Sequence, residues 1–517
     1  MKTIKRKAAA LILAVVMIGL VFGGCSPAKE GSEGKTSADD KTTASSTSGS
    51  DKETPPDSKN EEPVTLRIFF GDISAPDDGL VADAVSEITQ KLINTKVEFV
   101  MFGQGEFAEK IPLLLASDEK MDIGFDAGWI DYVGRSRAGA YLDLTELLKT
   151  TPDLYKAIDP LLWQGVTIDG GIYGVPTYKE LAEQWALYAE TDFLKENNID
   201  PKSITKLADA EVILEALKKD PNRAGFMITA VLSASSPSFV ALDMMDYYDV
   251  ILDSYVVSKE EGKTVVDYWM TEEYESFVRL MRDWYNKGYI ASDVATREGY
   301  DEYTDNDIHN YGLGLVSYSP LNEVASSKSY GKDLTPIPIT PITTTNGSTR
   351  GSINCIYAKS EHPDRAIQFL ELWNTKPEIK NLITFGIEGK HYNLVDGKVE
   401  PVPDVDKLYL NQNWRTGNMF ISYLMVGEPD DKYDKYLEFN DQAVASVVLG
   451  FTPDTKSIDD KIAACRGAFK EYGNLLSVGA IDPDEYLPKL RDALKAAGSD
   501  DIVAELQKQL DEWNKSK

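Results

Sequence analysis

Residues 64–125 alternate between two hydrophobic periods, and this alternation restricts the fold more than any other feature of the chain. Short runs rich in β-branched and aromatic residues lie at Val64–Phe70, 97–102 and 121–125. Between them, apolar residues recur every three to four positions over 80–94 and 107–117, which is the period of an amphipathic helix. This order of strands and helices predicts an α/β fold with a mostly parallel sheet.

Asp126, Trp129 and Tyr132 follow the third predicted strand. Ligands of parallel sheets bind beyond the carboxyl ends of the strands, so these three side chains are candidates for a binding site. A tryptophan that packs on the next helix explains the same pattern equally well, and both interpretations stay open.

The middle of the chain continues the mixed pattern. Apolar periodicity predicts helices at 204–219 and 274–287 and strands at 226–232, 312–319 and 353–358.

The stretch 171–199 is typical of a connection between two halves of a fold. A short extended piece ends at Pro176, whose fixed φ and missing N–H donor stop a strand there. A polar and aromatic patch follows, with Tyr178, Lys179, Glu180 and Trp185. We expect this patch to face a cleft between two lobes. The alternative is an ordinary loop in which Tyr178 and Trp185 are core residues.

The first 24 residues have the organisation of a secretory signal peptide. Basic residues precede an apolar run at 8–22, which ends in Gly23, Gly24 and Cys25. The run is too short for a comfortable membrane-spanning helix. The segment resembles a bacterial lipobox, in which the cysteine becomes the lipidated first residue. This implies that Cys25 anchors the chain to the cell membrane on the extracellular face; an uncleaved anchor and a plain signal peptide are the alternatives.

The composition of residues 25–63 predicts a disordered tether. From Ser26 to Pro63 there is no Val, Ile, Leu, Met, Phe, Tyr or Trp. The segment therefore cannot bury enough apolar surface to offset the entropy lost on ordering.

The net charge of −30 restricts the partners of the chain. Such acidity argues against nucleic acid and against adsorption on anionic lipid. His309, His362 and His391 have no metal-ligand spacing, so we expect no metal site and no cofactor. Cys355 and Cys465 either pair or, as we expect, stay as two buried free thiols.

The segment 357–393 carries the most specific pattern in the chain. A His-Pro-Asp-Arg-Ala helix start at 362–366 precedes a second helix at Pro377–Phe385 and a glycine-rich stretch at 386–389. This order resembles the return segment of bacterial extracellular solute-binding proteins of the sugar-binding class. The strings at 386–392, 439–451 and 497–513 resemble the LipO-type lipoprotein branch of that family.

The resemblance implies a type II periplasmic-binding-protein-like fold, in which hinge crossings join two α/β lobes around a cleft. By this analogy residues 64–180 and 352–392 form lobe 1, and residues 181–351 and 393–517 form lobe 2. The lobes would close over a small solute, by analogy a sugar, and deliver it to an ABC import permease. The analogy also implies a monomer without enzymatic activity.

The resemblance places further ligand-binding residues where the crossings meet. Tyr318, Trp414 and Arg415 are expected from lobe 2, and Tyr392 from the last crossing. Aromatic rings cover the apolar face of a pyranose, and charged groups bind its hydroxyls. The chain departs from the family after Tyr318, because many oligosaccharide binders carry a Pro-Trp pair there.

Three other functions stay open. A secreted glycosidase would need an acid–base pair of carboxylates, and a secreted esterase would show a GxSxG motif, which is absent. A binder of peptide or acidic cell-wall sugar would need basic residues in the cleft, such as Lys179, Arg350 and Arg415. A lipoprotein that regulates or scaffolds without transport is the third.

Overall fold

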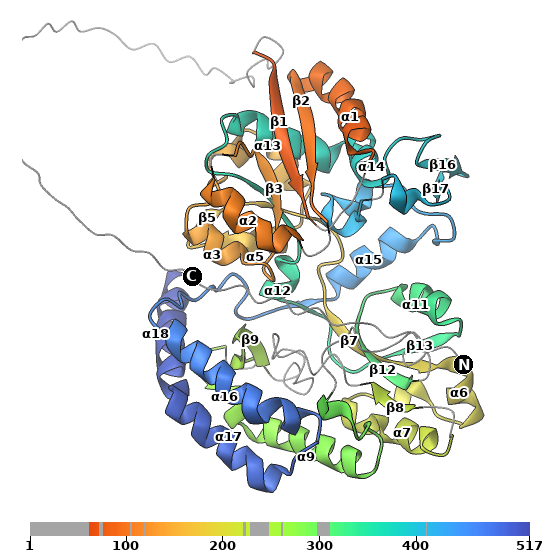
Figure 1. Ribbon diagram of the computed structural model, residues 1–517, viewed down its shortest axis with the longest axis vertical. Coiled ribbons are helices and arrows are strands. Elements are labelled where there is room, and N and C mark those ends of the chain that lie inside the picture. Colours follow the sequence, from red (N-terminus) through yellow and green to blue (C-terminus); the bar gives the residue numbers. More distant parts are fainter. Residues whose placement is uncertain are drawn as a thin grey trace, which may run out of the picture. The chain divides into compact units, whose positions relative to one another are not determined.

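Figure 1 shows the computed structural model, which describes residues 62–71, 76–103, 106–117, 119–220, 224–227, 248–259, 262–296, 311–409 and 411–517. All of these residues belong to one compact unit of the chain. The predicted signal peptide at 1–24, Cys25 and nearly all of the tether at 25–63 lie outside the described residues.

A five-stranded sheet with the order β2-β1-β3-β15-β6 organises the first half of the fold. Strands β1 (Val64–Phe70), β2 (Thr95–Met101) and β3 (Ile123–Asp126) are parallel, which confirms the prediction from the alternating pattern. Strands β15 (Ile353–Ile356) and β6 (Val175–Pro176) complete the sheet, and β15 runs antiparallel to both of its neighbours. The sheet is therefore mixed, because its fourth strand comes from a segment that returns from the second half.

Helices cover this sheet because their apolar stripes need burial. The turn from α1 into β2 is made by Asn94 in the left-handed conformation, with φ of 48° and its N–H bonded to the carbonyl of Gln90. The helices and small strands of this half are α1 (Asp78–Ile93), α2 (Glu106–Ala116), α3 (Tyr132–Arg137), α4 (Pro152–Lys156), α5 (Pro160–Val166), α13 (Pro363–Thr375), α14 (Pro377–Phe385), β4 (Thr167–Ile168), β5 (Gly171–Ile172), β16 (Tyr392–Val395) and β17 (Lys398–Pro401).

A second sheet has the order β13-β7-β12-β8. Its strands are β7 (Gln184–Glu190), β8 (Ala224–Met227), β12 (Tyr311–Tyr318) and β13 (Leu334–Pro338), and a three-stranded antiparallel sheet of β9 (Tyr248–Leu252), β10 (Tyr255–Ser258) and β11 (Val265–Asp267) accompanies it. The helices of this half are α6 (Thr191–Glu196), α7 (Glu211–Leu217), α9 (Glu272–Asn286), α11 (Asn322–Tyr330), α16 (Asp459–Ser477), α17 (Pro483–Ala497) and α18 (Ser499–Ser516).

The predicted helix at 204–219 is shorter in the structure. The carboxylate of Asp209 accepts the backbone N–H groups of Thr205 and Lys206 at 3.0 and 3.3 Å, and these bonds hold the start of the segment outside the helix. A 3-10 turn follows at Leu207–Ala210, and α7 begins only at Glu211. The predicted strand at 226–232 corresponds to β8, and its second half lies outside the described residues.

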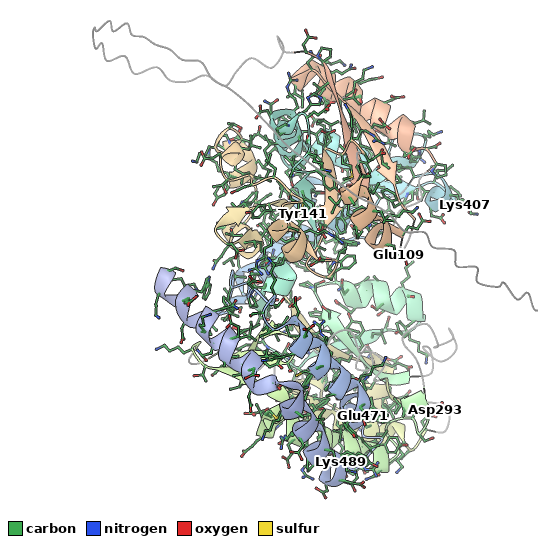
Figure 2. All side chains as sticks on the ribbon, turned by 60° about the vertical axis from the view of Figure 1, so that its left-hand side comes forward. Glu109, Tyr141, Asp293, Lys407, Glu471 and Lys489 are labelled. Carbon is green, nitrogen blue, oxygen red and sulfur yellow. The ribbon has the colours of Figure 1, made fainter. Side chains whose placement is uncertain are left out.

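Each half has its own hydrophobic core. The first core, which includes Phe70 and Trp373, lies around the five-stranded sheet, and the second core, which includes Trp269 and Trp284, lies around the second sheet. Cys355 is buried in the first core and Cys465 in the second, and neither forms a disulfide. Figure 2 marks Tyr141 in the first half, and Glu471 and Lys489 on the C-terminal helices of the second.

Three crossings connect the two halves, and backbone pairing joins them to one another. The first runs from β6 to β7, the second from β13 to β15, and the third, which begins at Met419, leads to α16. In the second, β14 (Thr343–Thr344) pairs in parallel with β18 (Val444–Ala445) of the third. Glu183 of the first crossing bridges Thr343. The second crossing also contains α12 (Asn346–Thr349), and α15 (Lys432–Asp441) precedes β18.

Residues that follow Tyr392, which we predict to be part of lobe 2, contact the first core. Tyr409 is part of the first core, where its hydroxyl donates to the carbonyl of Ile383 at 2.7 Å, and Trp414 packs against the same core. The next residue of the chain that belongs to the second core is Val448. Residues after Tyr392 thus belong to the first half until the third crossing.

Candidate functional site

Three aromatic rings meet at the carboxyl edge of the first sheet. The ring centroid of Phe125, in β3, lies 6.2 Å from that of Trp129 and 6.0 Å from that of Trp414. Phe125 is buried, Trp414 is half-buried, and Trp129 is 61% exposed. The two indoles come from distant parts of the chain, and they flank one phenyl ring. We call Phe125, Trp129 and Trp414 the edge aromatic group.

The second crossing fixes the loop that carries Trp129. The indole Nε1 of Trp129 donates to the carbonyl of Gly351 at 3.0 Å. The N–H of Gly128 donates to the carbonyl of Arg350 at 2.8 Å. An exposed tryptophan with a fixed ring is pre-organised for contact with a flat apolar surface, because little rotamer entropy is lost on binding.

Arg415 packs against two rings of the edge aromatic group. Its guanidinium carbon lies 4.4 Å from the ring centroid of Trp414 and 5.6 Å from that of Phe125, which is cation–π geometry. The guanidinium also donates to the carbonyl of Gly71, directly after β1. Arg415 is buried, so it ties the Trp414 turn to the sheet.

Asp126 and Tyr132, which the sequence places at the site, are core residues. Asp126 is fully buried and accepts from Arg135 Nη1 at 3.0 Å, from the N–H of Ala127 at 2.7 Å and from the hydroxyl of Tyr141. Burial raises the pKa of its carboxyl group. The buried hydroxyl of Tyr132 donates to the carbonyl of Val166 at 2.8 Å. We therefore leave both residues out of the proposed site.

A second set of aromatic rings lies at the first and third crossings. The Tyr178 and Phe420 ring centroids are 4.7 Å apart, and Phe420 lies 5.8 Å from Tyr433. The N–H of Met419 donates to the carbonyl of Tyr178 at 2.8 Å, which holds the two crossings together. Burial, followed by the charges of Asp159 and Asp441, raises the pKa of Tyr178 to about 12. We call Tyr178, Phe420 and Tyr433 the hinge aromatic group.

Glu180 brings an unsatisfied acceptor to the same crossing. Its Oε1 lies 3.6 Å from Lys179 Nζ, whereas its Oε2 is buried without a hydrogen bond in the described part of the chain. Lys179 also donates to the carbonyl of Glu180 at 3.2 Å. Burial, followed by the negative charge of Glu180, raises the pKa of the Tyr436 hydroxyl. A buried carboxylate oxygen without a donor is a natural acceptor for a ligand hydroxyl.

Trp185, Tyr318 and Tyr392 occupy three different environments. Trp185 is the second residue of β7, opposite Ser317 in β12, and its N–H donates to Thr340 Oγ1 at 2.8 Å. Tyr318 ends β12, with its ring 6.4 Å from that of Phe439. Both side chains are half-buried. Tyr392 is buried in a small separate cluster with Phe385 and contacts neither aromatic group, so we leave it out of the proposed site.

Sequence reasoning missed Phe125, Phe420 and Tyr433. Phe125 is the last residue of the strand predicted at 121–125, and its ring lies between the two indoles. Phe420 and Tyr433 lie in the segment that the sequence assigned to the second lobe. The density of aromatic residues between Trp414 and Tyr436 was the signal that could have found them.

The chain matches known families in two places. Residues 83–387 match the model of the family described as "Bacterial extracellular solute-binding protein". Residues 447–515 match a domain of unknown function. The first match takes in more than half of the chain and includes the first sheet's return strand β15.

Two curated proteins are similar over most of the chain. A "Carbohydrate ABC transporter substrate-binding protein" of Streptococcus pneumoniae serotype 4 is 29% identical over 468 residues, which are 88% of this chain and 92% of that protein. The "Polygalacturonan/rhamnogalacturonan-binding protein YtcQ" of Bacillus subtilis strain 168 is 24% identical over 390 residues, which are 70% of this chain and 75% of that protein.

Solved structures agree with these matches. The N-glycan transport solute binding protein NgtS from Streptococcus pneumoniae superposes with a TM-score of 0.76 at 25% identity, over 88% of this chain and 99% of that one. Its complex with Man5GlcNAc gives a TM-score of 0.64 at 27% identity, over 88% of this chain and 99% of that one. The two-lobe, type II fold predicted from the resemblance is thereby confirmed. This chain belongs to the family of bacterial extracellular solute-binding proteins.

Proposed function

We propose that this protein is an extracellular, lipid-anchored receptor that captures a carbohydrate and delivers it to an ABC import permease. The observation that carries the proposal is the edge aromatic group, in which Trp129 is 61% exposed beside Phe125 and Trp414. A pyranose has an apolar face of C–H groups that matches an indole ring, and its hydroxyls find partners at the rim. The half-buried pair Lys179 and Glu180 supplies such polar partners.

A neutral glycan suits the chain better than an acidic one. The net charge of −30 repels an anion at long range. The edge aromatic group binds through ring faces and needs no ligand charge. The relatives named above favour a carbohydrate: one is named for N-glycan transport and another for polygalacturonan and rhamnogalacturonan. An acidic cell-wall sugar is therefore the second candidate.

Capture would proceed by closure of two halves over the ligand. The first and third crossings carry the hinge aromatic group. Its member Phe420 lies on the same segment, 414–420, as Trp414 of the edge aromatic group. A ligand that contacts both halves favours the closed state by its differential affinity for it. Lipidation of Cys25 would keep the receptor near the permease, and two or more acyl chains would make that anchoring stable.

We propose that the protein binds its ligand without catalysis, because the relatives reported above are named as binding proteins. Among the described residues no cluster of His, Cys, Asp and Glu could hold a metal ion. The described part of the chain also contains no helix with the length and apolar character to cross a membrane. We propose a monomeric receptor, because closure around a single ligand requires only the two halves of one chain.

The test is a thermal-shift panel on the full chain with Cys25→Ser, which removes the lipidation site. The ligands are Man1GlcNAc, Man5GlcNAc, kestose, a trigalacturonate and an unrelated tripeptide. A ligand at one hundred times its Kd contributes about 2.7 kcal/mol to the free energy of unfolding, so Tm rises with concentration. We expect a neutral glycan to give the largest rise. A rise with trigalacturonate alone favours the second candidate, and a rise with the peptide alone contradicts the proposal.

A further inference from the structure

Residues 411–423 carry one member of each aromatic group and have little regular structure of their own. Trp414 lies in a 3-10 turn at Asn413–Arg415, and Phe420 lies in another at Met419–Ile421. Each turn is only three residues long, so the directions of these two side chains depend on contacts with neighbouring elements. Helix α14 supplies several of these contacts.

Lys380 of α14 is the centre of that support. It is fully buried, and its Nζ donates to Asn413 Oδ1 at 2.6 Å, Thr416 Oγ1 at 2.7 Å and Thr384 Oγ1 at 2.9 Å. An ammonium group has three N–H donors, and here it meets three acceptor oxygens. Two of these acceptors belong to Asn413 and Thr416, which flank Trp414 in the sequence.

The hydrogen bonds continue from Lys380 to the hinge aromatic group. The amide Nδ2 of Asn413 donates to Ser422 Oγ at 3.0 Å, and Ser422 Oγ bonds with the Tyr433 hydroxyl at 2.7 Å. The Tyr433 ring contacts that of Phe420. One buried cation is thus linked to Trp414 through the turn and to Phe420 through Tyr433.

Burial of a lysine side chain at this position costs more free energy than burial of an apolar side chain. All three acceptors are neutral oxygens, so the desolvated charge has no carboxylate to offset its burial. Burial lowers the pKa of the Lys380 ammonium well below its ordinary value. Arg415, in the same turn as Asn413, directs its guanidinium to Gly71, and the Tyr433 hydroxyl bonds with Ser422 of the network. An apolar side chain would pack here at lower cost, but it would leave the direction of the turn unspecified.

We propose that Lys380 is a positioning residue that holds Trp414 and Phe420 in the geometry that binds the glycan. Lys380 touches no ligand and acts through Asn413 and Thr416. The inference rests on the proposed function, because its readout is the affinity for a carbohydrate.

The test compares Lys380→Gln with Lys407→Gln in the Cys25→Ser chain. Gln replaces three N–H donors with two, adds a carbonyl acceptor and removes the charge. Lys407 is an exposed lysine that pairs with Asp404 and serves as the matched control (Figure 2). The probe is the panel glycan with the largest thermal shift, measured by isothermal titration calorimetry. We expect about tenfold weaker binding for Lys380→Gln and unchanged binding for Lys407→Gln; equal affinity of Lys380→Gln and the wild type overturns the inference.

A double-mutant cycle separates positioning from general weakening. If Lys380 acts through Trp414 and Phe420, the effect of Lys380→Gln is smaller in a Trp414→Ala background than in the wild type, and it is full in a Trp129→Ala background. A full effect in both backgrounds overturns the inference. If Lys380→Gln does not fold, Thr416→Val, which removes one acceptor from the turn, replaces it with the same two outcomes.

The pH dependence of the glycan affinity distinguishes a positioning lysine from a purely structural one. Between the lowered Lys380 pKa and the ordinary lysine pKa of about 10.4, the folded chain has lost a proton that the unfolded chain retains. The free energy of unfolding of the wild type therefore rises with pH relative to Lys380→Gln. As pH rises through the lowered pKa of Lys380, the affinity for the glycan falls, because the neutral amine has two N–H donors for three acceptors. Affinity that is independent of pH in both proteins overturns the inference.

The failures of the two proposals are distinguishable. A wild-type chain that binds no glycan in the panel contradicts the proposed function, and the positioning role with it. A wild-type chain that binds a glycan, together with Lys380→Gln at full affinity, contradicts the positioning role alone.

Discussion

The indole Nε1 of Trp129 donates to the carbonyl of Gly351 at 3.0 Å, although the two residues lie on different segments of the fold. Trp129 follows the last parallel strand of the first sheet, and Gly351 ends the second crossing between the two halves. The ring is thus 61% exposed and still fixed in direction. The hinge region itself orients the most exposed ring of the edge aromatic group.

Trp129→Ala tests this ring directly. We expect glycan affinity to fall about tenfold, because an aromatic contact contributes about 0.5–1.5 kcal/mol beyond the area it buries. The free energy of unfolding should change by less than about 1 kcal/mol, because the side chain is mostly exposed. Titration calorimetry and urea unfolding measure the two quantities.

Tyr155→Ala is the matched control for Trp129→Ala. Tyr155 is also an exposed aromatic residue, and it stacks on Trp163 with ring centroids 5.2 Å apart. It lies in α4, outside both aromatic groups. Equal loss of affinity in the two variants would contradict a specific role for Trp129.

Glu180→Gln tests the unsatisfied acceptor at the first crossing. Because Oε2 of Glu180 is buried without a partner, we expect it to accept a hydrogen bond from a sugar hydroxyl. A hydrogen bond to a charged group contributes about 1.5–3 kcal/mol, so affinity should fall at least tenfold. Glu190→Gln removes a carboxylate that already pairs with Lys332 and should leave affinity unchanged. If both variants bind like the wild type, Glu180 has no ligand contact.

The two thiols should be unreactive in the folded protein. Cys355 and Cys465 are buried and unpaired, and burial raises the pKa of both thiols, so little thiolate is present at neutral pH. With Cys25→Ser, we expect no reaction with a thiol-specific chromogenic reagent under native conditions. In urea without reductant, two thiols per chain should react. No reactive thiol in urea would show a disulfide instead.

We expect the ionised carboxylate of Asp77 to stabilise the folded protein, and we expect acid to remove this stabilisation. Its carboxylate bonds with His391 Nε2 at 3.1 Å and lies 3.2 Å from Lys390 Nζ. These two hydrogen bonds, that of His391 first, lower the pKa of Asp77 below its ordinary value of 3.8. Because the folded pKa is lower than the unfolded one, the stabilisation is present above the ordinary pKa and is lost as pH falls through the folded pKa.

Urea unfolding of the wild type and Asp77→Asn over pH 2–5 measures this contribution, with the range set by the ordinary carboxyl pKa of about 4. We expect the difference in free energy of unfolding between the two proteins to shrink as pH falls. Asp83→Asn, an exposed site on α1, is the control. A difference that is constant with pH would contradict a role for the Asp77 charge.

Strong local patterns made much of the fold predictable. Strand β1 and helix α14 have the predicted bounds, because an apolar run fixes the first and Pro377 the start of the second. The predicted start of the helix at 204–219 was wrong, because the carboxylate of Asp209 competes there with helical hydrogen bonds. Propensity and periodicity do not record such a side-chain contact.

The site was less predictable than the fold, because burial depends on distant contacts. Asp126 and Tyr132 follow the correct strand, but Arg135 and Val166 bind them inside the core. Trp414 is predicted in lobe 2, but it packs against the first core, where Asn413 of its turn accepts from a buried lysine thirty-odd residues earlier in the chain. A lysine in an amphipathic helix is ordinarily an exposed residue, so no sequence pattern marked Lys380.

The most direct test of the central claim is a crystal structure of the Cys25→Ser chain with the panel glycan that gives the largest thermal shift. The account predicts a sugar ring with its C–H face against the indole of Trp129 or Trp414, and a sugar hydroxyl within hydrogen-bond distance of Glu180. A glycan bound elsewhere on the chain, in contact with neither indole, would contradict it.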